Sequence, residues 1–394
     1  MDKNNNNYDK KKVLILVNEL LLGGAQRIIL DISRNINKDE FDLLVVYLKS
    51  HDNFGLDVKN LSNDIAEFGV RVIGLNGKKK FTFLEYQKLL DLLKTEKPDV
   101  LHTFLPYAGI IGRIAGRFIG IKKIISTQCN LPVAYSFKIY WLDKITLPLA
   151  HVWTGATEGI EQLYGGSAAL FKRDLWEKGR RHFTIVAGVD LPVFDKTFES
   201  VDRKTKRKEI GVPESPILVT MTARMIPWKG HADVVEAMTY LPNNFHLILI
   251  GWGVLEGDLK KRVNNLGLGE RVNFLGVRND VTEILAITDI YVQAHSRALD
   301  GKIWMGPNTS QMEACAARIP SISTKVPLID CLIEDGVTGK LSLPNNPKDL
   351  ARSIKYMVDH HQEAKFMAEN ARKRVEERYS VDSMVKSYQL LYNI

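Results

Sequence analysis

Short apolar runs alternate along the chain with longer segments of helical spacing. Val13 to Val17 is continuously apolar, as expected for a strand that is buried on both faces of a parallel sheet. Ala25 to Ile36 then repeats its apolar residues every three or four positions, which is typical of a helix. Leu218 to Met221 and Leu247 to Ile250 begin a second series of the same kind. The alternation predicts an α/β protein with parallel sheets wrapped by helices.

The length of 394 residues allows two domains, each with its own core. We expect a disordered N-terminus at residues 1–10, a first Rossmann-like domain at 11–190, a linker at 191–215 and a second Rossmann-like domain at 216–377. The linker is predicted from its prolines and its run of charged residues. Tyr379 and Ser380 predict a break before a final helix at about 378–394.

The composition excludes several classes of protein. Hydrophobic residues make up 45% and charged residues 25%, which are ordinary values for a globular protein. No apolar run reaches the ~20 residues of a spanning helix, and no signal peptide is evident. Three cysteines without a CxxC pair are too few for a disulfide scaffold. We therefore expect a cytoplasmic protein.

The net charge is +8, with basic clusters at residues 78–80, 113–123, 178–181 and 203–208. Nucleic acid is a poor candidate partner, because no helix-turn-helix, zinc-finger or aromatic RNP pattern accompanies the lysines. An anionic membrane surface or a polyanionic acceptor would fit the charge, and so would ordinary solvated faces. Charge alone leaves these two interpretations open.

The second half of the chain holds residues suited to a nucleoside diphosphate. Arg224 and Lys229 follow one predicted strand, and Gly251 and Gly253 follow the next. Two fixed cations neutralise phosphates, and glycine lets backbone N–H groups approach them. Glu313 lies in a predicted helix further on, where its carboxylate could accept hydrogen bonds from ribose hydroxyls.

The order of these motifs resembles the donor half of the retaining glycosyltransferases of family GT4. The resemblance implies the GT-B fold, in which two Rossmann-like, doubly wound domains face a cleft and the final helix packs on the first domain. It also implies that Arg224 and Lys229 contact the donor diphosphate, that the loop with Arg278 frames the base through its backbone, and that Glu313 binds the ribose. Gly23 and Gly24 begin a stretch that resembles the family's GGAER-type loop. The implied catalytic residues are Arg224, Lys229, Asp300 and His102, and the implied donor-binding residues are Gly23, Gly24, Gly251, Gly253, Arg278, Asn308, Thr309 and Glu313.

The chain departs from the family pattern at the first glutamate of the E-x7-E motif. Eight residues before Glu313 stands Met305, and the nearest acid is Asp300, separated from Pro307 by a longer stretch than usual. Either Asp300 contacts the sugar across an enlarged loop, or the site has changed its donor or lost catalysis. We favour the first account, because loop substitutions are how one fold changes substrate.

His102 ends a predicted strand at a position where many family members carry a histidine. Phe104 and Cys129 stand where further family histidines are common, so the acceptor side is less well matched. For His102 itself, a catalytic role and a hydrogen-bonded, partly buried side chain are equally compatible with the sequence.

The resemblance predicts transfer of a sugar from a nucleoside-diphosphate sugar to a glycan or lipid-linked acceptor, with retention of configuration. No DxD sequence occurs, and cationic side chains can replace a metal, so we expect no divalent metal or other cofactor. Attachment to the inner face of a membrane is a hypothesis from the basic clusters. The alternatives are a different GT-B enzyme such as a sugar-nucleotide epimerase or a phosphorylase, a catalytically silent GT-B scaffold, and a basic membrane-binding module.

Overall fold

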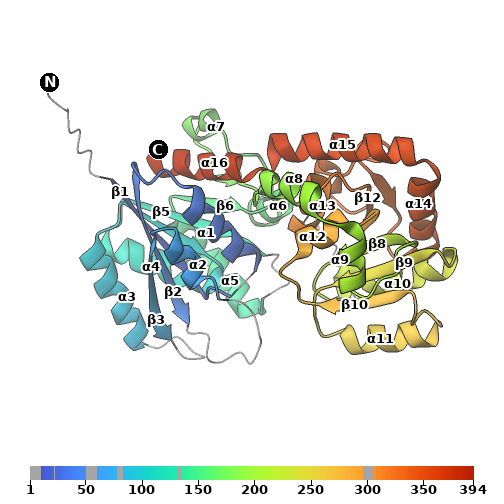
Figure 1. The fold of residues 1–394 in the computed structure, drawn as a ribbon. Helices are drawn as coiled ribbons and strands as arrows, with labels where there is room; N and C mark the ends of the chain where they lie inside the picture. Colours follow the sequence, from blue (N-terminus) through green and yellow to red (C-terminus); the bar gives the residue numbers. More distant parts are fainter. Residues whose placement is uncertain are drawn as a thin grey trace, which may run out of the picture. The chain divides into compact units, whose positions relative to one another are not determined.

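The computed structural model describes residues 10–21, 23–49, 60–77, 83–130, 135–295, 306 and 308–394. Within these ranges the chain forms two compact units, each built on one parallel sheet (Figure 1). Unit 1 holds the described residues up to Gly188 together with Val381–Ile394, and unit 2 holds Val189–Ser380. The predicted α/β class is confirmed in both units.

The sheet of unit 1 has the described strand order β3-β2-β1-β4-β5-β6-β7, and every neighbouring pair is parallel. The chain leaves β1 toward one edge and returns beside it with β4, which is the doubly wound topology. The strands are β1 (Lys11–Val17), β2 (Phe41–Lys49), β3 (Arg71–Gly77), β4 (Val100–Phe104), β5 (Lys123–Gln128), β6 (Val152–Gly155) and β7 (His182–Thr184).

Helices cover this sheet and include the last helix of the chain, α16. They are α1 (Gly24–Asn35), α2 (Ser62–Glu67), α3 (Phe83–Glu96), α4 (Pro106–Ile119), α5 (Phe137–Thr146), α6 (Glu158–Gly165), α7 (Arg173–Glu177) and α16 (Val381–Asn393), with a 3₁₀ turn at Leu147–Leu149. α15 ends at Arg378 and α16 begins at Val381, so the predicted helix break at Tyr379 and Ser380 is confirmed.

The sheet of unit 2 is also parallel, with the described order β10-β9-β8-β11-β12-β13. Its strands are β8 (Ile217–Thr222), β9 (Phe245–Ile250), β10 (Val272–Gly276), β11 (Ile290–Gln293), β12 (Ser321–Thr324) and β13 (Lys340–Ser342). Its helices are α8 (Leu191–Ser200), α9 (Arg203–Glu209), α10 (His231–Ala237), α11 (Glu256–Asn265), α12 (Val281–Ala286), α13 (Thr309–Ala316), α14 (Pro347–Asp359) and α15 (His361–Arg378), with 3₁₀ turns at Pro227–Lys229, Met238–Tyr240 and Ile329–Cys331.

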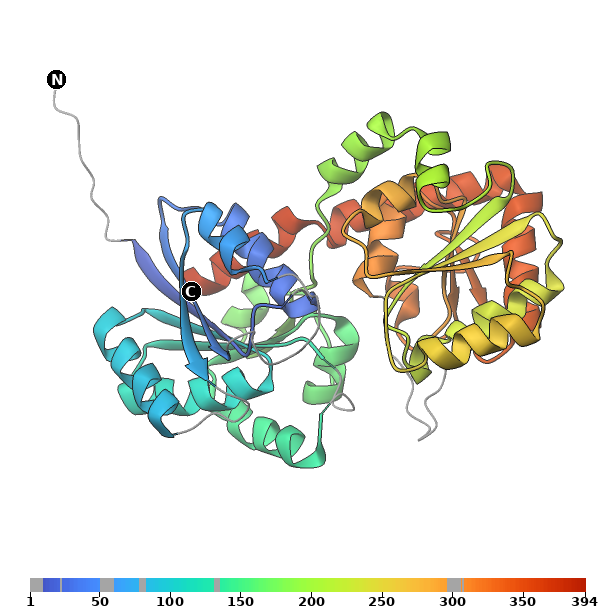
Figure 2. The same cartoon turned by 60° about the horizontal axis from the view of Figure 1, so that its bottom comes forward.

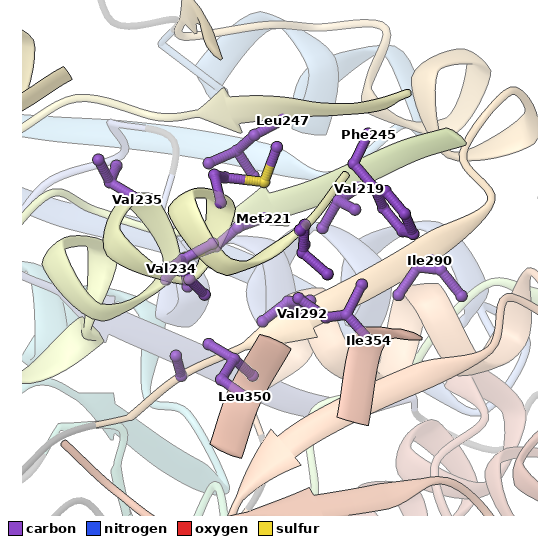
Figure 3. Close-up of a cluster of buried hydrophobic side chains, with 14 of the residues drawn as sticks. Val219, Met221, Val234, Val235, Phe245, Leu247, Ile290, Val292, Leu350 and Ile354 are labelled. Atoms are coloured by element: carbon purple, nitrogen blue, oxygen red, sulfur yellow. The ribbon is translucent and has the colours of Figure 1, made fainter. Parts of the chain in front are cut away.

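The core of unit 2 explains why its central strand β8 has apolar residues on both faces. Successive residues of β8 point to opposite faces of the sheet. On one face Val219 packs with Val234 of α10 and Leu350 of α14, in the cluster shown in Figure 3. On the other face Leu218 packs with Ile284 of α12. Both faces are therefore covered by helices, as a parallel strand with apolar residues on both faces requires.

Residues 191–215 differ from the predicted linker. They form α8 and α9, which belong to unit 2 and are drawn as helices in Figure 2. Arg207 of α9 is buried and donates hydrogen bonds to Asp289 and to the backbone oxygen of Pro216. The charged residues that suggested an exposed linker include side chains that attach α9 to the sheet, so the boundary between the units lies at Gly188 instead.

Candidate functional site

The loop after β8 places two cations at the carboxyl edge of the unit 2 sheet. Arg224 is exposed, whereas Lys229 is buried at the end of the 3₁₀ turn Pro227–Lys229. Gly230 follows with φ of +73°, and a Cβ atom there would stand 1.5 Å from the backbone oxygen of Ala294. Only glycine lets the loop run this close to the end of β11.

The ammonium group of Lys229 lies in an unusual environment for a lysine. Its side-chain Nζ is 3.2 Å from Nε2 of His295, and the residue is 7% exposed. Burial, together with the charge of Arg224, lowers the pKa of Lys229 to about 7. Burial also holds the pKa of His295 well below its usual value, so this imidazole is neutral at physiological pH. An incoming anion would favour the charged form of the lysine.

The N-terminus of α13 lies beside this pair. Asn308 is its N-cap residue, and its side-chain oxygen accepts a hydrogen bond from the backbone N–H of Gln311 at 2.8 Å. The amide Nδ2 of Asn308 is 3.5 Å from Nε2 of His295. Ser310 donates a hydrogen bond to the backbone oxygen of Thr222, which attaches the helix to the end of β8. Free backbone N–H groups at such a helix start favour an anion.

Thr309 and Glu313 lie on α13 itself, both half-buried. Glu313 stands one turn along the helix from Thr309, four positions away, so the two side chains share one face. The structure thus places Asn308, Thr309 and Glu313 on one element, adjacent to the loop of Lys229.

Gly251 and Gly253 pack against the loop that carries Arg224. A Cβ atom on Gly251 would stand 2.2 Å from the backbone oxygen of Ala223, and one on Gly253 would stand 2.3 Å from that of Met225. The backbone N–H of Met225 donates to the oxygen of Trp252 at 2.8 Å. These glycines therefore have a packing role in positioning Arg224, and their contact with the donor stays a prediction.

The side chain of Arg278 is engaged in ion pairs. Its guanidinium donates hydrogen bonds to Asp280 at 2.7 and 2.5 Å, and to Glu209 at 3.1 Å. The hydrogen bonds from Arg278 and Lys206 hold the pKa of Asp280 well below its usual range. The side chain of Arg278 is therefore occupied by ion pairs, and the contact of this loop with the donor base stays a prediction.

Asp300, Met305 and Pro307 lie outside the described residues. The choice between a sugar-contacting Asp300 and an altered site therefore stays a prediction. The described chain resumes at Gly306 and Asn308, at the start of α13.

In unit 1, Gly23 and Gly24 follow β1 at the point where the strand order reverses. Gly23 is the N-cap residue of α1, and both glycines are exposed. A Cβ atom on Gly23 would stand 2.8 Å from Oε1 of Gln26, whose amide donates to the backbone oxygen of Glu19. The exposed N–H groups of this helix start suit an anion, and the switch point is where doubly wound sheets bind ligands.

His102 lies in the core of unit 1. It is fully buried in β4, its Nδ1 is 2.8 Å from the hydroxyl of Tyr392 in α16, and its Nε2 is 2.7 Å from Oγ1 of Thr127 in β5. Burial lowers the pKa of His102 to about 3. The geometry favours the hydrogen-bonded buried histidine over the catalytic one, because both ring nitrogens are engaged within the core.

Two known families match successive parts of the chain. Residues 22–156 match Glycosyltransferase Family 4, and residues 202–374 match Glycosyl transferases group 1. Together these matches span more than half of the chain and include the loop of Gly23 and Gly24, the Arg224–Lys229 loop and α13.

The chain belongs to the GT4-type glycosyltransferases.

Relatives of this glycosyltransferase support the assignment. The UDP-Gal:alpha-D-GlcNAc-diphosphoundecaprenol alpha-1,3-galactosyltransferase of Escherichia coli is 24% identical over 383 residues, which cover 94% of both chains. The N-acetyl-alpha-D-glucosaminyl L-malate synthase of Bacillus anthracis is 26% identical over 315 residues, or 77% of both chains.

Solved structures agree on the fold. Anabaena HepE in complex with UDP and glucose superposes with a TM-score of 0.79 at 20% identity, covering 98% of this chain and 100% of that chain. Sucrose-phosphate synthase from Thermosynechococcus elongatus gives 0.75 at 18% identity, with 98% of each chain covered. The glycosyltransferase has the GT-B fold. At identities of 18–20%, the similarity to these structures shows the fold alone.

The structure brings together the predicted Lys229, Asn308, Thr309 and Glu313 at one edge of the unit 2 sheet. Gly23, Gly24 and His102 belong to unit 1. Sequence reasoning missed His295, which contacts both Lys229 and Asn308. Its signal was the short apolar run Ile290 to Val292 shortly before it, since side chains just past a strand reach the carboxyl edge of a parallel sheet.

In this glycosyltransferase, the lowered pKa of His102 predicts that unit 1 loses stability in acid. The unfolded state binds a proton below pH ~6.5, whereas the folded state resists protonation down to about pH 3. The free energy of unfolding should therefore fall as pH falls from 6.5 toward 3, by up to ~1.4 kcal/mol per pH unit from this residue. His102→Gln should lower stability at pH 7.5 by about 1–3 kcal/mol and make the acid slope shallower.

Urea denaturation at pH 7.5 and pH 5 measures both effects. His361→Gln, on the exposed start of α15, is the matched control and should change neither value. An acid slope in His102→Gln as steep as in the wild type would contradict the assignment.

Proposed function

We propose that this glycosyltransferase transfers a sugar from a uridine-diphosphate sugar to a glycan or lipid-linked saccharide, with retention of anomeric configuration. The observation that carries the proposal is the buried Lys229 beside the N-terminus of α13, with the exposed Arg224 on the same loop. The E. coli relative is named for a UDP-galactose donor, and Anabaena HepE has been solved with UDP and with UDP-glucose. The GT4 family supports retention.

The proposed donor site uses cations where other glycosyltransferases use a metal. Arg224 and Lys229 would neutralise the diphosphate, and the N–H groups at the start of α13 would add partial positive charge. Glu313 would accept hydrogen bonds from the ribose hydroxyls. Because these groups can stabilise the departing diphosphate by themselves, we propose that transfer needs no divalent metal and proceeds unchanged in EDTA.

In the proposed reaction the bond between the sugar's anomeric carbon and the diphosphate oxygen breaks as a bond to the acceptor hydroxyl oxygen forms on the same face. The acceptor's proton passes to the departing phosphate oxygen. The protein's contribution is to hold the two substrates and to stabilise the charge that develops on the diphosphate. In this scheme His102 has no step, which agrees with its burial.

A lipid-linked acceptor is the class we favour. The E. coli relative is named for an acceptor carried on diphosphoundecaprenol, and it covers 94% of this chain. None of the helices among the described residues is long and apolar enough to cross a membrane. We therefore propose a cytoplasmic enzyme that meets its acceptor at the inner membrane face by peripheral attachment.

A thermal-shift screen against nucleoside diphosphates and their sugar conjugates, without added metal, tests the donor site. UDP at 100 times its Kd should stabilise the wild type by about 2.7 kcal/mol. Glu313→Ala should weaken this binding by about 1.5–3 kcal/mol, because it removes hydrogen bonds to a charged group. Glu270→Ala, an exposed change in the same unit, is the matched control and should bind as the wild type does.

Stabilisation by another nucleotide class would correct the base, and hydrolysis of the sugar conjugate without acceptor would then report a working enzyme. If no nucleotide stabilises the wild type, the donor site is absent and the catalytically silent scaffold becomes the better account. A nucleotide sugar whose sugar is epimerised and not transferred would favour the epimerase.

A further inference from the structure

Helix α5 of unit 1 presents an apolar stripe to solvent. Phe137, Trp141 and Ile145 follow one another at intervals of four residues and therefore share one face of the helix. Their exposed fractions are 74%, 43% and 66%, and the adjacent Leu142 is 53% exposed. A surface helix normally directs such residues into the core. Four exposed apolar side chains on a helix of ten residues therefore indicate a surface that binds a partner.

The opposite face of α5 is attached firmly to unit 1. Asp143 is fully buried and forms an ion pair with Arg113 of α4 at 2.7 Å. Tyr140 packs edge-on against Tyr164 of α6, with ring centroids 5.9 Å apart. The helix is thus held by a buried ion pair and an aromatic contact, and these contacts set the apolar stripe outward.

The charges beside the stripe indicate the kind of partner. Lys138 and Lys144 are exposed on either side of it, and the Nζ atom of Lys144 is 5.9 Å from the ring of Trp141. Asp143 is the one acidic residue in the sequence of α5, and it points inward. The exposed face of α5 is therefore aromatic, aliphatic and cationic, which is the composition of helices that lie in the interface of an anionic membrane.

A second copy of the chain fits this face less well. A symmetric pairing of two α5 faces would place Lys138 and Lys144 of each copy against the same cations of the other. An anionic lipid surface neutralises these lysines, accepts the apolar side chains among its acyl chains and suits tryptophan at the level of the headgroups.

The neighbouring helix α4 also carries exposed apolar side chains. Ile114 and Phe118 of α4 are one turn apart and are 42% and 73% exposed. α4 and α5 are packed against each other, with Gly109 of α4 close to both Arg113 and Asp143.

We propose that the outward face of α5 (Phe137, Lys138, Trp141, Leu142, Lys144 and Ile145) is a membrane-docking surface that inserts its apolar stripe into an anionic lipid leaflet. The inference rests on the proposed function in one respect, because a lipid-linked acceptor would be met at that leaflet. Its structural basis is separate, since Arg224, Lys229 and Glu313 belong to unit 2 and α5 belongs to unit 1.

Vesicle co-sedimentation of the full chain tests the docking surface. We would compare vesicles of phosphatidylglycerol mixed with phosphatidylcholine against vesicles of phosphatidylcholine alone. The wild type should bind the anionic vesicles, and Phe137→Ser/Ile145→Ser should bind at least about tenfold more weakly. Lys138→Ala/Lys144→Ala should lose about fivefold per lysine, on the anionic vesicles only.

The matched control replaces two exposed apolar residues on other helices, in Phe366→Ser/Leu390→Ser, which are 66% and 46% exposed in the wild type. It should bind vesicles as the wild type does. Quenching of Trp141 fluorescence by lipids with brominated acyl chains should occur in the wild type and be lost in Trp141→Phe. Because all these positions are exposed, each variant should unfold at the temperature of the wild type.

Two results would overturn the proposal: no binding of the wild type to anionic vesicles, or equal binding by Phe137→Ser/Ile145→Ser. Self-association of the wild type that disappears in this variant, without vesicle binding, would assign the face to a second copy. UDP binding measured on the same samples separates the two proposals. Vesicle binding without UDP binding would contradict only the proposed donor site. UDP binding without vesicle binding would contradict only the proposed docking surface.

Discussion

Replacing Lys229 with methionine is expected to lower kcat/KM for sugar transfer by about 10²–10³-fold. In the proposed site Lys229 supplies a charge to the departing diphosphate from a buried position, where solvent does not screen it. The loss of a single such donor in other enzymes costs a factor of this size. Methionine keeps the length and apolar character of the side chain, so the change is confined to the charge and its hydrogen bonds.

The pH dependence of donor binding gives this prediction a second readout. Burial lowers the pKa of Lys229 to about 7, so the free enzyme loses this proton as pH rises above 7. A bound diphosphate raises the pKa again, and binding above pH 7 must therefore take up a proton. The affinity of the wild type for UDP should fall as pH rises from 7 to 9, whereas Lys229→Arg should bind without this decline.

The stability of Lys229→Met distinguishes a ligand-binding role from a structural one. A buried amine costs stability when it must be charged, so methionine should leave the melting temperature of the free enzyme unchanged or higher. Lys261→Met, at a side chain that is 80% exposed in α11, is the matched control for transfer. A Lys229→Met variant that transfers sugar at the rate of the wild type would remove Lys229 from the mechanism.

Breaking the buried ion pair of unit 1 is expected to have the largest effect on stability. Arg113 and Asp143 are both fully buried, with Nη2 and Oδ1 2.7 Å apart. Arg113 also donates to Ser126 at 2.7 Å and to Thr146 at 2.6 Å. Arg113→Met would leave the carboxylate of Asp143 buried without its cation, which costs about 3–5 kcal/mol.

Burial already raises the pKa of Asp143, and the charge of Arg113 opposes this rise. Arg113→Met removes the positive charge that limits this rise, so the pKa of Asp143 increases further above its value of ~3.9 in the unfolded state. The folded state then binds more protons than the unfolded state, and the free energy of unfolding should fall as pH rises above 4. Urea denaturation at pH 4.5 and pH 7.5 measures the difference, which should be larger in the variant than in the wild type.

Two further variants separate the ion pair from its surroundings. Arg113→Met/Asp143→Leu removes both charges and should recover most of the lost stability, because neither partner remains buried alone. Arg173→Met breaks the exposed pair of Arg173 with Glu177, 68% and 62% exposed, and should cost about 0–1 kcal/mol. A loss in Arg113→Met no larger than in Arg173→Met would contradict the account.

The fold class followed from the sequence because a parallel sheet covered on both faces requires continuously apolar strands. Val13 to Val17 is such a run, and Leu218 to Met221 is one apart from Thr220. Both lie in the middle of their sheets, as β1 and β8. Arg224, Lys229 and Glu313 could likewise be predicted as site residues from the sequence, because each lies in a motif that follows a predicted strand or opens a helix.

The prediction from the sequence was wrong for a run of charged residues. The run that includes Arg203 and Arg207 predicts a solvated linker, but Arg203 and Arg207 each bond to Asp289 and attach α9 to unit 2. The exposed or buried state of a charged side chain depends on its partner, and that partner is 80 or more residues away along the chain. A local pattern carries no record of such a pairing.

The sequence by itself therefore determined the α/β class, the two successive units and the residues available for a diphosphate site. The tertiary structure decided which of those residues meet. It brought His295 to Lys229, enclosed His102 between Tyr392 and Thr127, and turned the apolar stripe of α5 outward by burying Asp143 on the opposite face. Periodicity along the chain specifies strands and helices, whereas burial and hydrogen-bond partners depend on contacts between residues far apart in sequence.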